Sequence, residues 1–162
     1  MKPLKNPYAK YDEYNCFGCS PDNPIGLNLE FYEKGEYIYA EWIPNHDMEG
    51  FFNVLHGGIQ ATMLDEIASW VVFVKLGTAG VTSKMEVRYK RPVSIENGKI
   101  RLQARLQQMN RNIAVIRSEI LDNNGSICSE ADVEYFTYSP EKAMQKLYYP
   151  GREEFLPDKD TE

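Results

Sequence analysis

The chain has 162 residues, 43% of them hydrophobic, and a formal net charge of −6. A single domain of this length buries roughly 70% of its unfolded surface and needs no covalent staples. The acidic balance argues against general nucleic-acid binding. The longest uncharged apolar run, residues 67–74, is too short to span a bilayer, and the first residues lack a signal-peptide pattern. We therefore expect a cytoplasmic protein with neither a membrane nor a nucleic-acid partner.

Three cysteines are present, and two of them form the motif Cys16-x-x-Cys19. An odd number of cysteines is typical of a reduced compartment rather than of a disulfide framework. The motif has no second cysteine pair, and the chain has only two histidines, His46 and His56. We therefore expect no bound metal and no cofactor.

The first half of the chain predicts two strands followed by one long helix. Turn-forming residues fill 21–26, and alternating apolar residues predict strands at 27–32 and 37–43, joined by a turn at 34–35. Residues 44–55 have no periodicity, which predicts a loop. Residues 58–76 are apolar on nearly every side, which predicts a buried helix that ends at Gly77.

The second half predicts four strands running as a meander, at 81–91, 99–107, 112–121 and 126–138. A short helix and a polar tail follow Pro140. The chain then divides into an N-terminal segment with a short helix or loop (1–26), one folded domain (27–138) and a C-terminal tail (139–162).

A helix that is apolar all round must be covered on all sides. We predict an α+β fold in which a curved antiparallel sheet wraps around this helix. A second copy of the chain would cover the remaining side and the free edge of the sheet.

The helix begins with two adjacent glycines, Gly57 and Gly58, after His56. Glycines leave the first backbone N–H groups of a helix uncovered, where the helix dipole adds positive charge. That arrangement suits the oxygen of a carbonyl that becomes negative during acyl transfer. Close packing of the helix against a strand explains the glycines equally well.

Asp65 lies seven residues after Gly58, on the same face of the predicted helix. A carboxylate there could serve as a base or a nucleophile, or Asp65 and Glu66 could form a polar flank. Asp65 is about 10 Å along the axis from Gly58, too far to act on a carbonyl held at that end. Two antiparallel helices related by a twofold axis would bring them together, so this chemistry predicts a dimer.

Basic residues are concentrated between Lys84 and Arg117, where nine Lys and Arg residues accompany only two acidic ones. Two interpretations stay open. The residues form either the solvated faces of strands or a surface that binds anions.

Three motifs together resemble a known family. They are His56-Gly57-Gly58 with Asp65 nine residues after the histidine, the segment Cys16–Leu27 (CFGCSPDNPIGL), and the strand Val87–Val93 (VRYKRPV). Over residues 14–138 the chain resembles the hotdog-fold acyl-CoA thioesterases of the PaaI-like group. The resemblance implies a hotdog fold, which assembles as a homodimer or a homotetramer.

The resemblance also implies roles for individual residues. Asp65 would be the base or nucleophile, the Gly57 N–H would polarise the thioester carbonyl with Gly58 beside it, His56 would shape that site, and Ser69 would position water. Many relatives carry an amide six residues before the histidine, where this chain has Gly50, so Asn53 is the substitute candidate. The remaining substrate contacts would come from hydroxyls (Thr82 or Ser83) and from cations for the CoA phosphates (Lys90, Arg91 and Arg111).

The function implied is hydrolysis of acyl-CoA thioesters to a free acid and CoA. The alternative is a non-catalytic protein that binds or senses acyl-CoA on the same fold. A Ser-His-Asp hydrolase is disfavoured because the chain has no Gly-x-Ser-x-Gly motif.

Overall fold

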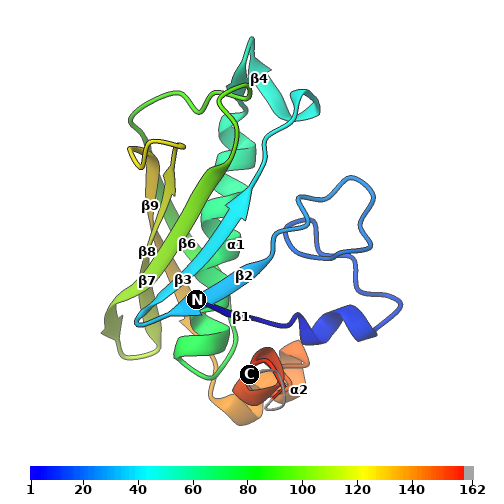
Figure 1. Cartoon of the computed structure of the whole chain (residues 1–162). Helices are drawn as coiled ribbons and strands as arrows, with labels where there is room; N and C mark the ends of the chain where they lie inside the picture. Colours follow the sequence, from blue (N-terminus) through cyan, green and yellow to red (C-terminus); the bar gives the residue numbers. More distant parts are fainter. Residues whose placement is uncertain (159–162) are drawn as a thin grey trace.

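The computed structural model describes residues 1–158 and shows a curved antiparallel sheet around one long helix (Figure 1). The long helix and the short C-terminal helix are α1 (Gly57–Lys75) and α2 (Pro140–Leu147). Three 3₁₀ helices are η1 (Pro7–Lys10), η2 (His46–Met48) and η3 (Arg152–Phe155). The strands are β1 (Lys2–Pro3), β2 (Phe31–Lys34), β3 (Tyr37–Trp42), β4 (Glu49–Phe51), β5 (Val54–Leu55), β6 (Gly80–Tyr89), β7 (Ile100–Asn110), β8 (Ile113–Leu121) and β9 (Ile127–Thr137).

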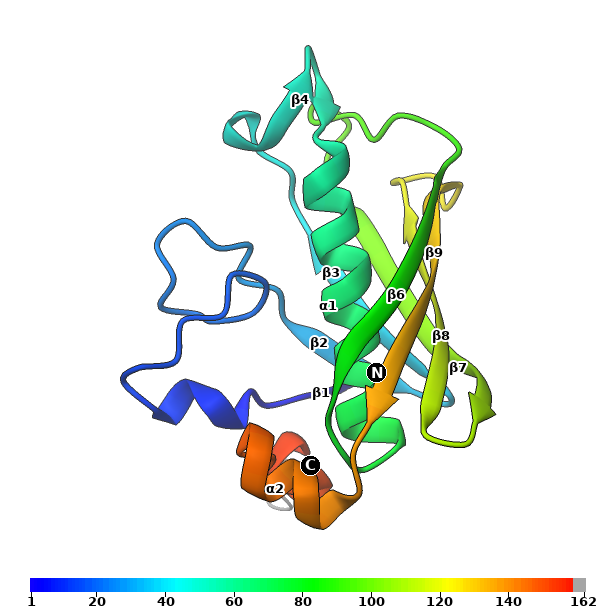
Figure 2. The same cartoon turned by 180° about the vertical axis from the view of Figure 1, so that it is seen from behind.

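Seven strands form the main sheet in the order β1-β2-β3-β7-β8-β9-β6, with every pair antiparallel. The core lies between the concave face of this sheet and α1, which buries Met63, Ile67 and Val71 completely. The sheet covers one side of α1, and the N-terminal segment lies on the other side (Figure 2). Within residues 1–158, no helix is both long and apolar enough to cross a membrane.

The prediction of a curved sheet around one long helix is confirmed, and α1 ends before Gly77, whose φ is +64°. The first predicted strand is wrong over residues 27–30. Asn28 has a φ of +51°, which interrupts extended backbone. The N–H groups of Leu27 and Leu29 donate instead to the carbonyls of Phe17 and Gly18. Part of the predicted loop 44–55 also forms structure, namely η2 and the β4–β5 hairpin.

The four C-terminal strands do not form one continuous meander, which corrects the sequence prediction. Strands β7, β8 and β9 pair in succession, but β6 pairs with β9 and β7 pairs with β3. Strand β6 is therefore the long free edge of the sheet, directly after α1 in the chain. This topology places the inner face of β6 beside α1.

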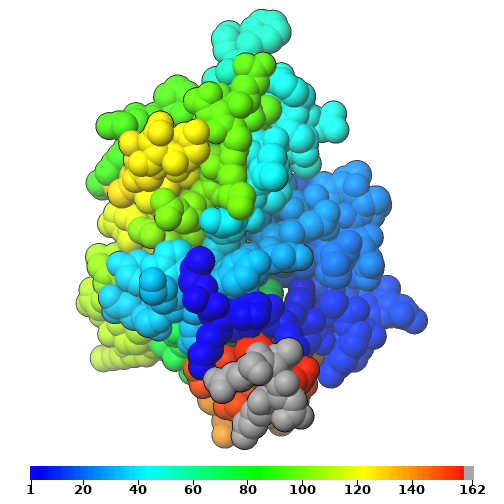
Figure 3. Space-filling model, in the orientation of Figure 1, coloured from blue at the N-terminus to red at the C-terminus, as the bar shows by residue number. Residues whose placement is uncertain are grey.

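The N-terminal and C-terminal segments lie against each other on the surface (Figure 3), and the C-terminal segment packs on the end of α1. The N–H of Lys5 donates to the carbonyl of Phe155, and the Phe155 ring stacks on Phe73 of α1. Tyr149 is also buried there, and its hydroxyl donates to the Phe73 carbonyl. The residues after Pro140 are therefore partly a packed element rather than only a polar tail.

Candidate functional site

The N-terminus of α1 is capped by His56, whose Nδ1 accepts a hydrogen bond from the Gly58 N–H at 2.9 Å. The Gly57 carbonyl accepts one from the Tyr89 hydroxyl at 2.7 Å. No acceptor for the Gly57 N–H is found among residues 1–158. The capping side chain therefore uses the amide of Gly58, and the amide of Gly57 keeps no protein acceptor among these residues.

A hollow of about 390 Å³ lies at this end of α1, lined in part by His56, Gly58 and Thr62. Beside it, a Cβ added at Gly50 would lie 3.0 Å from the Cα of His56, so an amide side chain at that position would displace backbone. Asn53 has a φ of +55° and lies in a tight turn. Its side-chain oxygen accepts hydrogen bonds from the Ser94 hydroxyl and the Glu96 N–H, which hold the loop after β6.

Asp65 lies on the face of α1 that the sheet leaves partly open. Its Oδ1 accepts hydrogen bonds from the Thr82 hydroxyl and the Tyr135 hydroxyl, each at 2.8 Å. The Tyr135 hydroxyl also lies 2.9 Å from the backbone carbonyl of Asp65. No donor to Oδ2 is found among the residues that the structure describes. The two hydroxyls thus fix one carboxylate oxygen and leave the other without a protein donor among the described residues.

A β-bulge determines which hydroxyl of β6 reaches Asp65. Thr82 pairs with Tyr135 and Lys84 with Glu134, so Ser83 is an extra residue in the ladder. Ser83 donates to the Glu134 carbonyl instead. Thr82 and Tyr135 are therefore cross-strand neighbours that both face α1. Of the two hydroxyls left open by the sequence, only that of Thr82 contacts Asp65.

Tyr135 is a site residue that sequence reasoning missed. It lies on β9, and alternation marks it only as a core residue facing inward. Burial, and then the charge of nearby Asp65, raise the pKa of Tyr135 well above its usual range, so its hydroxyl stays a donor. The pairing of β6 with β9 places it opposite Thr82, so that both hydroxyls meet at Asp65.

Ser69 follows Asp65 by one turn but bonds elsewhere: its hydroxyl donates to the Glu66 carbonyl at 2.7 Å. It opens into a pocket of about 650 Å³ on the side of α1 that faces the N-terminal segment. Cys16, Glu66 and Trp70 line the same pocket. Trp70 is buried, whereas Phe52, in the turn between β4 and β5, is 86% exposed.

Glu66, Cys16 and Cys19, which line this pocket, have shifted pKa values. Burial, and then the charge of Cys16, raise the pKa of Glu66 to about 7. The hydrogen bond from the Cys19 thiol lowers the pKa of Cys16 to about 5, against an opposing effect of burial. The same contact, with burial, raises the pKa of Cys19 far above its usual range. The protons of these three groups are therefore interdependent.

The predicted phosphate-binding residues do not meet within one chain. Lys90 and Arg91 follow the end of β6 at Tyr89, which pairs with Ser129. Arg111 lies in the β7–β8 turn, level with Val81 at the other end of β6, because Ile113 and Val81 both pair with Phe136. Eight residues of strand separate these ends, about 27 Å.

Most of the basic run forms ion pairs along the sheet rather than one anion site. Five of the nine basic residues have carboxylate partners, Lys90 with Glu130 at 3.0 Å among them. The others are Lys84, Arg88, Lys99 and Arg117. The interpretation as charged strand faces therefore accounts for the larger part of the run.

Known proteins share this architecture. Residues 52–129 match the thioesterase superfamily. An uncharacterized protein of Schizosaccharomyces pombe is 35% identical over 65 residues, which cover 40% of this chain and 36% of that protein's length. The crystal structure of a thioesterase from Haemophilus influenzae has a TM-score of 0.61 and 25% identity, covering 70% of this chain and 80% of that one.

A thioesterase protein from Streptococcus pneumoniae, solved with coenzyme A, has a TM-score of 0.64 at 19% identity. The match covers 70% of this chain and 90% of that one. The fold agrees with the sheet, the helix and the edge strand described above. Residues 52–129 thus match the thioesterase superfamily, and the chain has the hotdog fold.

Proposed function

We propose that this chain hydrolyses acyl-CoA thioesters to a free acid and CoA, with Asp65 as base or nucleophile. The observation that carries the proposal is the Asp65 carboxylate, fixed through Oδ1 by Thr82 and Tyr135 on an open face of α1. The match of residues 52–129 to the thioesterase superfamily supports this reaction, and the similarity to a protein solved with coenzyme A supports the substrate class.

Two routes use the same geometry. As a base, Asp65 takes a proton from water, and the resulting hydroxide adds to the thioester carbonyl carbon. As a nucleophile, Oδ2 adds to that carbon, the C–S bond breaks, and water then hydrolyses the anhydride formed with Asp65. In both routes the CoA thiolate leaves and takes up a proton, and the acid is released.

The Gly57 N–H is the proposed donor to the carbonyl oxygen as it becomes negative. Gly57 and Asp65 of one helix are about 12 Å apart along the axis, at 1.5 Å per residue. One chain therefore does not supply both groups to one carbonyl. A partner helix running antiparallel would bring the Asp65 of one protomer to the Gly57 of the other.

Exposed side chains support a homodimer, or a homotetramer built from dimers. Strand β6 offers ten residues of free edge, and its inner-face residue Tyr89 is 53% exposed. Phe51 and Phe52, in the β4–β5 hairpin region, are 73% and 86% exposed. A second copy paired along β6 would cover the edge and the adjacent helix face.

The same pairing supports the predicted phosphate contacts. An antiparallel partner reverses the direction of β6, so its Arg111 end would approach the end that carries Lys90 and Arg91. Cations from two chains would then surround the nucleotide of CoA. The geometry favours a substrate contact by Asn53 less than those of the cations, because the side-chain oxygen of Asn53 already accepts two hydrogen bonds.

Release of free CoA thiol from a panel of acyl-CoAs tests the proposal. The wild-type chain and Glu86→Gln, an exposed carboxyl on β6, should turn over, whereas Asp65→Asn should lose most of its turnover. Wild-type rates in Asp65→Asn would contradict the role of Asp65. CoA binding by the wild type without thiol release would favour the non-catalytic alternative.

Multiple turnovers in ¹⁸O-labelled water separate the two routes. The nucleophilic route leaves the label in the Asp65 carboxyl after repeated cycles, because water can attack the Asp65 carbon of the anhydride. The base route places the label only in the released acid. Mass spectrometry of the peptide that contains Asp65 distinguishes them.

A further inference from the structure

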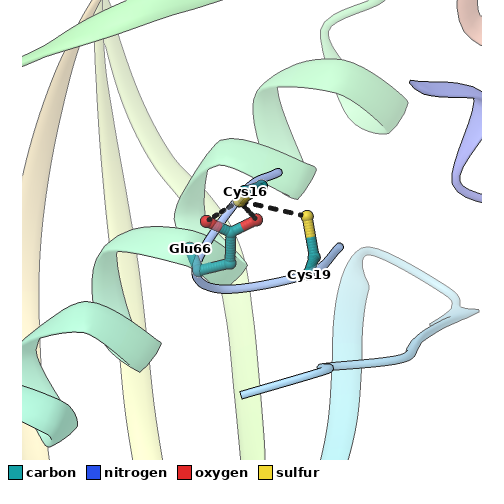
Figure 4. A group of neighbouring side chains, drawn as sticks. All are labelled: Cys16, Cys19 and Glu66. Carbon is teal, nitrogen blue, oxygen red and sulfur yellow. Dashed lines mark hydrogen bonds between the residues drawn. The ribbon is translucent and has the colours of Figure 1, made fainter. Parts of the chain in front are cut away.

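The motif Cys16-x-x-Cys19 meets a carboxylate that comes 50 residues after Cys16. The two Sγ atoms are 3.5 Å apart, and both cysteines are free thiols. The Cys16 Sγ lies 3.7 Å and 3.6 Å from the two carboxylate oxygens of Glu66. One ligand atom from each of the three residues lies within 4.8 Å of the other two (Figure 4).

Two of the three separations, between the sulfurs and between Cys16 and Glu66, are close to those of a tetrahedral zinc site. Zinc binds thiolate sulfur at about 2.3 Å and carboxylate oxygen at about 2.0 Å. At the tetrahedral angle, two sulfurs are then about 3.8 Å apart, and a sulfur and an oxygen about 3.5 Å. The 3.5 Å between sulfurs and the 3.6 Å between sulfur and oxygen are within a few tenths of an ångström of these values.

We propose that Cys16, Cys19 and Glu66 bind one Zn²⁺ ion, whose fourth position opens into the 650 Å³ pocket that all three line. Two thiolates and one carboxylate are donors that zinc accepts, while the hard cations Mg²⁺ and Ca²⁺ prefer oxygen alone. The thiols release their protons to solvent on binding. This proposal replaces the expectation of no metal, which counted only cysteines and histidines as ligands.

Gly18 lets the carboxylate approach the cysteine turn. A Cβ added at Gly18 would lie 2.6 Å from Cγ, Cδ and Oε2 of Glu66. Any other residue would push this flexible side chain away from the sulfurs. Gly18 is thus a positioning residue for the third ligand.

Groups around the ligands hold them in place, as is usual for metal sites. The Trp70 indole N–H donates to Glu66 Oε1 at 3.3 Å, which fixes the carboxylate from the next turn of α1. The Tyr14 hydroxyl lies 3.0 Å from the Cys19 Sγ, and the Asn6 amide donates to the Cys19 carbonyl at 3.0 Å. Both cysteines therefore occupy fixed positions relative to α1.

Cobalt(II) is the spectroscopic probe, used with the full chain after chelation under reducing conditions. We expect one Co²⁺ per chain, with a thiolate-to-cobalt charge-transfer band and the visible bands of tetrahedral cobalt. Zn²⁺ should displace the cobalt, and metal analysis should find one zinc per chain. Zinc should also raise the melting temperature, because it joins the N-terminal segment to α1.

Matched variants assign the ligands. Cys16→Ser with Cys19→Ser should abolish the charge-transfer band, whereas Cys128→Ser, a buried cysteine outside the cluster, should keep it. Glu66→Gln and Gly18→Ala should keep the band but weaken zinc binding by about 10-fold or more. Gly18→Ala keeps all three ligands, so its loss of affinity would report the position of the carboxylate.

Two outcomes would overturn the proposal. One is a reduced wild-type chain that shows no thiolate-to-cobalt band, a result that needs no variant to fold. The other is equal zinc binding by the wild type and the double serine variant. Both readouts measure metal rather than hydrolysis, so the proposal stands or fails independently of the proposed activity.

Discussion

The Tyr135 hydroxyl lies 2.8 Å from Asp65 Oδ1 and 2.9 Å from the backbone carbonyl of the same residue. A strand residue thus orients the proposed catalytic carboxylate while Thr82, its neighbour across the ladder, donates to the same oxygen. The sheet, and not only the helix, therefore sets the direction of Asp65.

Tyr135→Phe removes one of these donors and leaves the ring. We expect kcat to fall on the order of 100-fold, because a carboxylate displaced by about 1 Å attacks poorly, with a smaller change in KM. The matched control is Tyr149→Phe, which removes a buried hydroxyl bonded to the Phe73 carbonyl. Both variants should lose about 1–2 kcal/mol of stability, but only Tyr135→Phe should lose turnover. Equal kcat values in the two variants would contradict a role in orientation.

Gly57→Pro tests the amide proposed to polarise the carbonyl. Gly57 is the first residue of α1, a position where proline is well tolerated, and it removes the N–H. Turnover should fall by about 10²–10³-fold, the usual effect of losing one such donor. Gly57→Ala keeps the N–H and adds a Cβ about 3.4 Å from the Tyr89 ring, an ordinary contact, so it should stay active. Wild-type turnover in Gly57→Pro would contradict a role of the Gly57 N–H in polarising the carbonyl.

Mixed dimers test whether each site takes groups from two chains. Asp65→Asn and Gly57→Pro would each be inactive alone. In a mixed dimer, one site would carry both substitutions and the other neither, so random exchange should restore about a quarter of wild-type activity. A site built within one chain would restore none. Thiol release after co-refolding measures the outcome, and tagged purification of the mixed dimer verifies its composition.

Glu130→Gln should reduce stability in a pH-dependent manner. The hydrogen bond from Lys90, and the charges of Lys90 and Arg117, hold the pKa of Glu130 below its usual range. A depressed pKa contributes stability above the ordinary glutamate value, about 4.3, and this contribution is lost as the pH falls. The variant should lose about 1–3 kcal/mol near neutral pH and much less at about pH 3. Denaturant unfolding at both pH values measures this.

The control for this prediction is Glu86→Gln. Glu86 pairs with Arg88 on the exposed face of β6, where both side chains are more than half exposed. Exposed ion pairs contribute little to the free energy of unfolding, so Glu86→Gln should be as stable as the wild type at both pH values. A loss of the same size in both variants would show that burial of Glu130 adds nothing.

The sequence predicted the parts of the fold that depend on local periodicity. The apolar run of α1, its stop at Gly77 and the alternation around Met85 and Leu102 each gave the right element. Pairing between distant strands was not predictable in this way. The position of β6 beside β9, rather than β7, depends on how the sheet closes around α1, which no local pattern encodes.

The candidate site likewise contains residues that local spacing predicted and residues that it did not. His56, Gly57 and Asp65 lie on one helix, so spacing alone related them. Tyr135 and Glu66 gained their roles only through contacts made 70 and 50 residues apart in the chain. Glu66 comes 50 residues after Cys16, and strands β2 and β3 lie between them in the chain. No sequence pattern therefore predicted that the carboxylate would lie beside the cysteine motif.

The extra residue at Ser83 has a consequence for evolution by insertion and deletion. Deleting it would leave Lys84 directly after Thr82, and alternation from Met85 would still turn Thr82 toward α1, opposite Tyr135. A ladder that lost its bulge while keeping Ser83 would instead bring the Ser83 hydroxyl to face Asp65 and turn Thr82 outward. The strand can therefore change by one residue at this point while a hydroxyl stays beside the carboxylate.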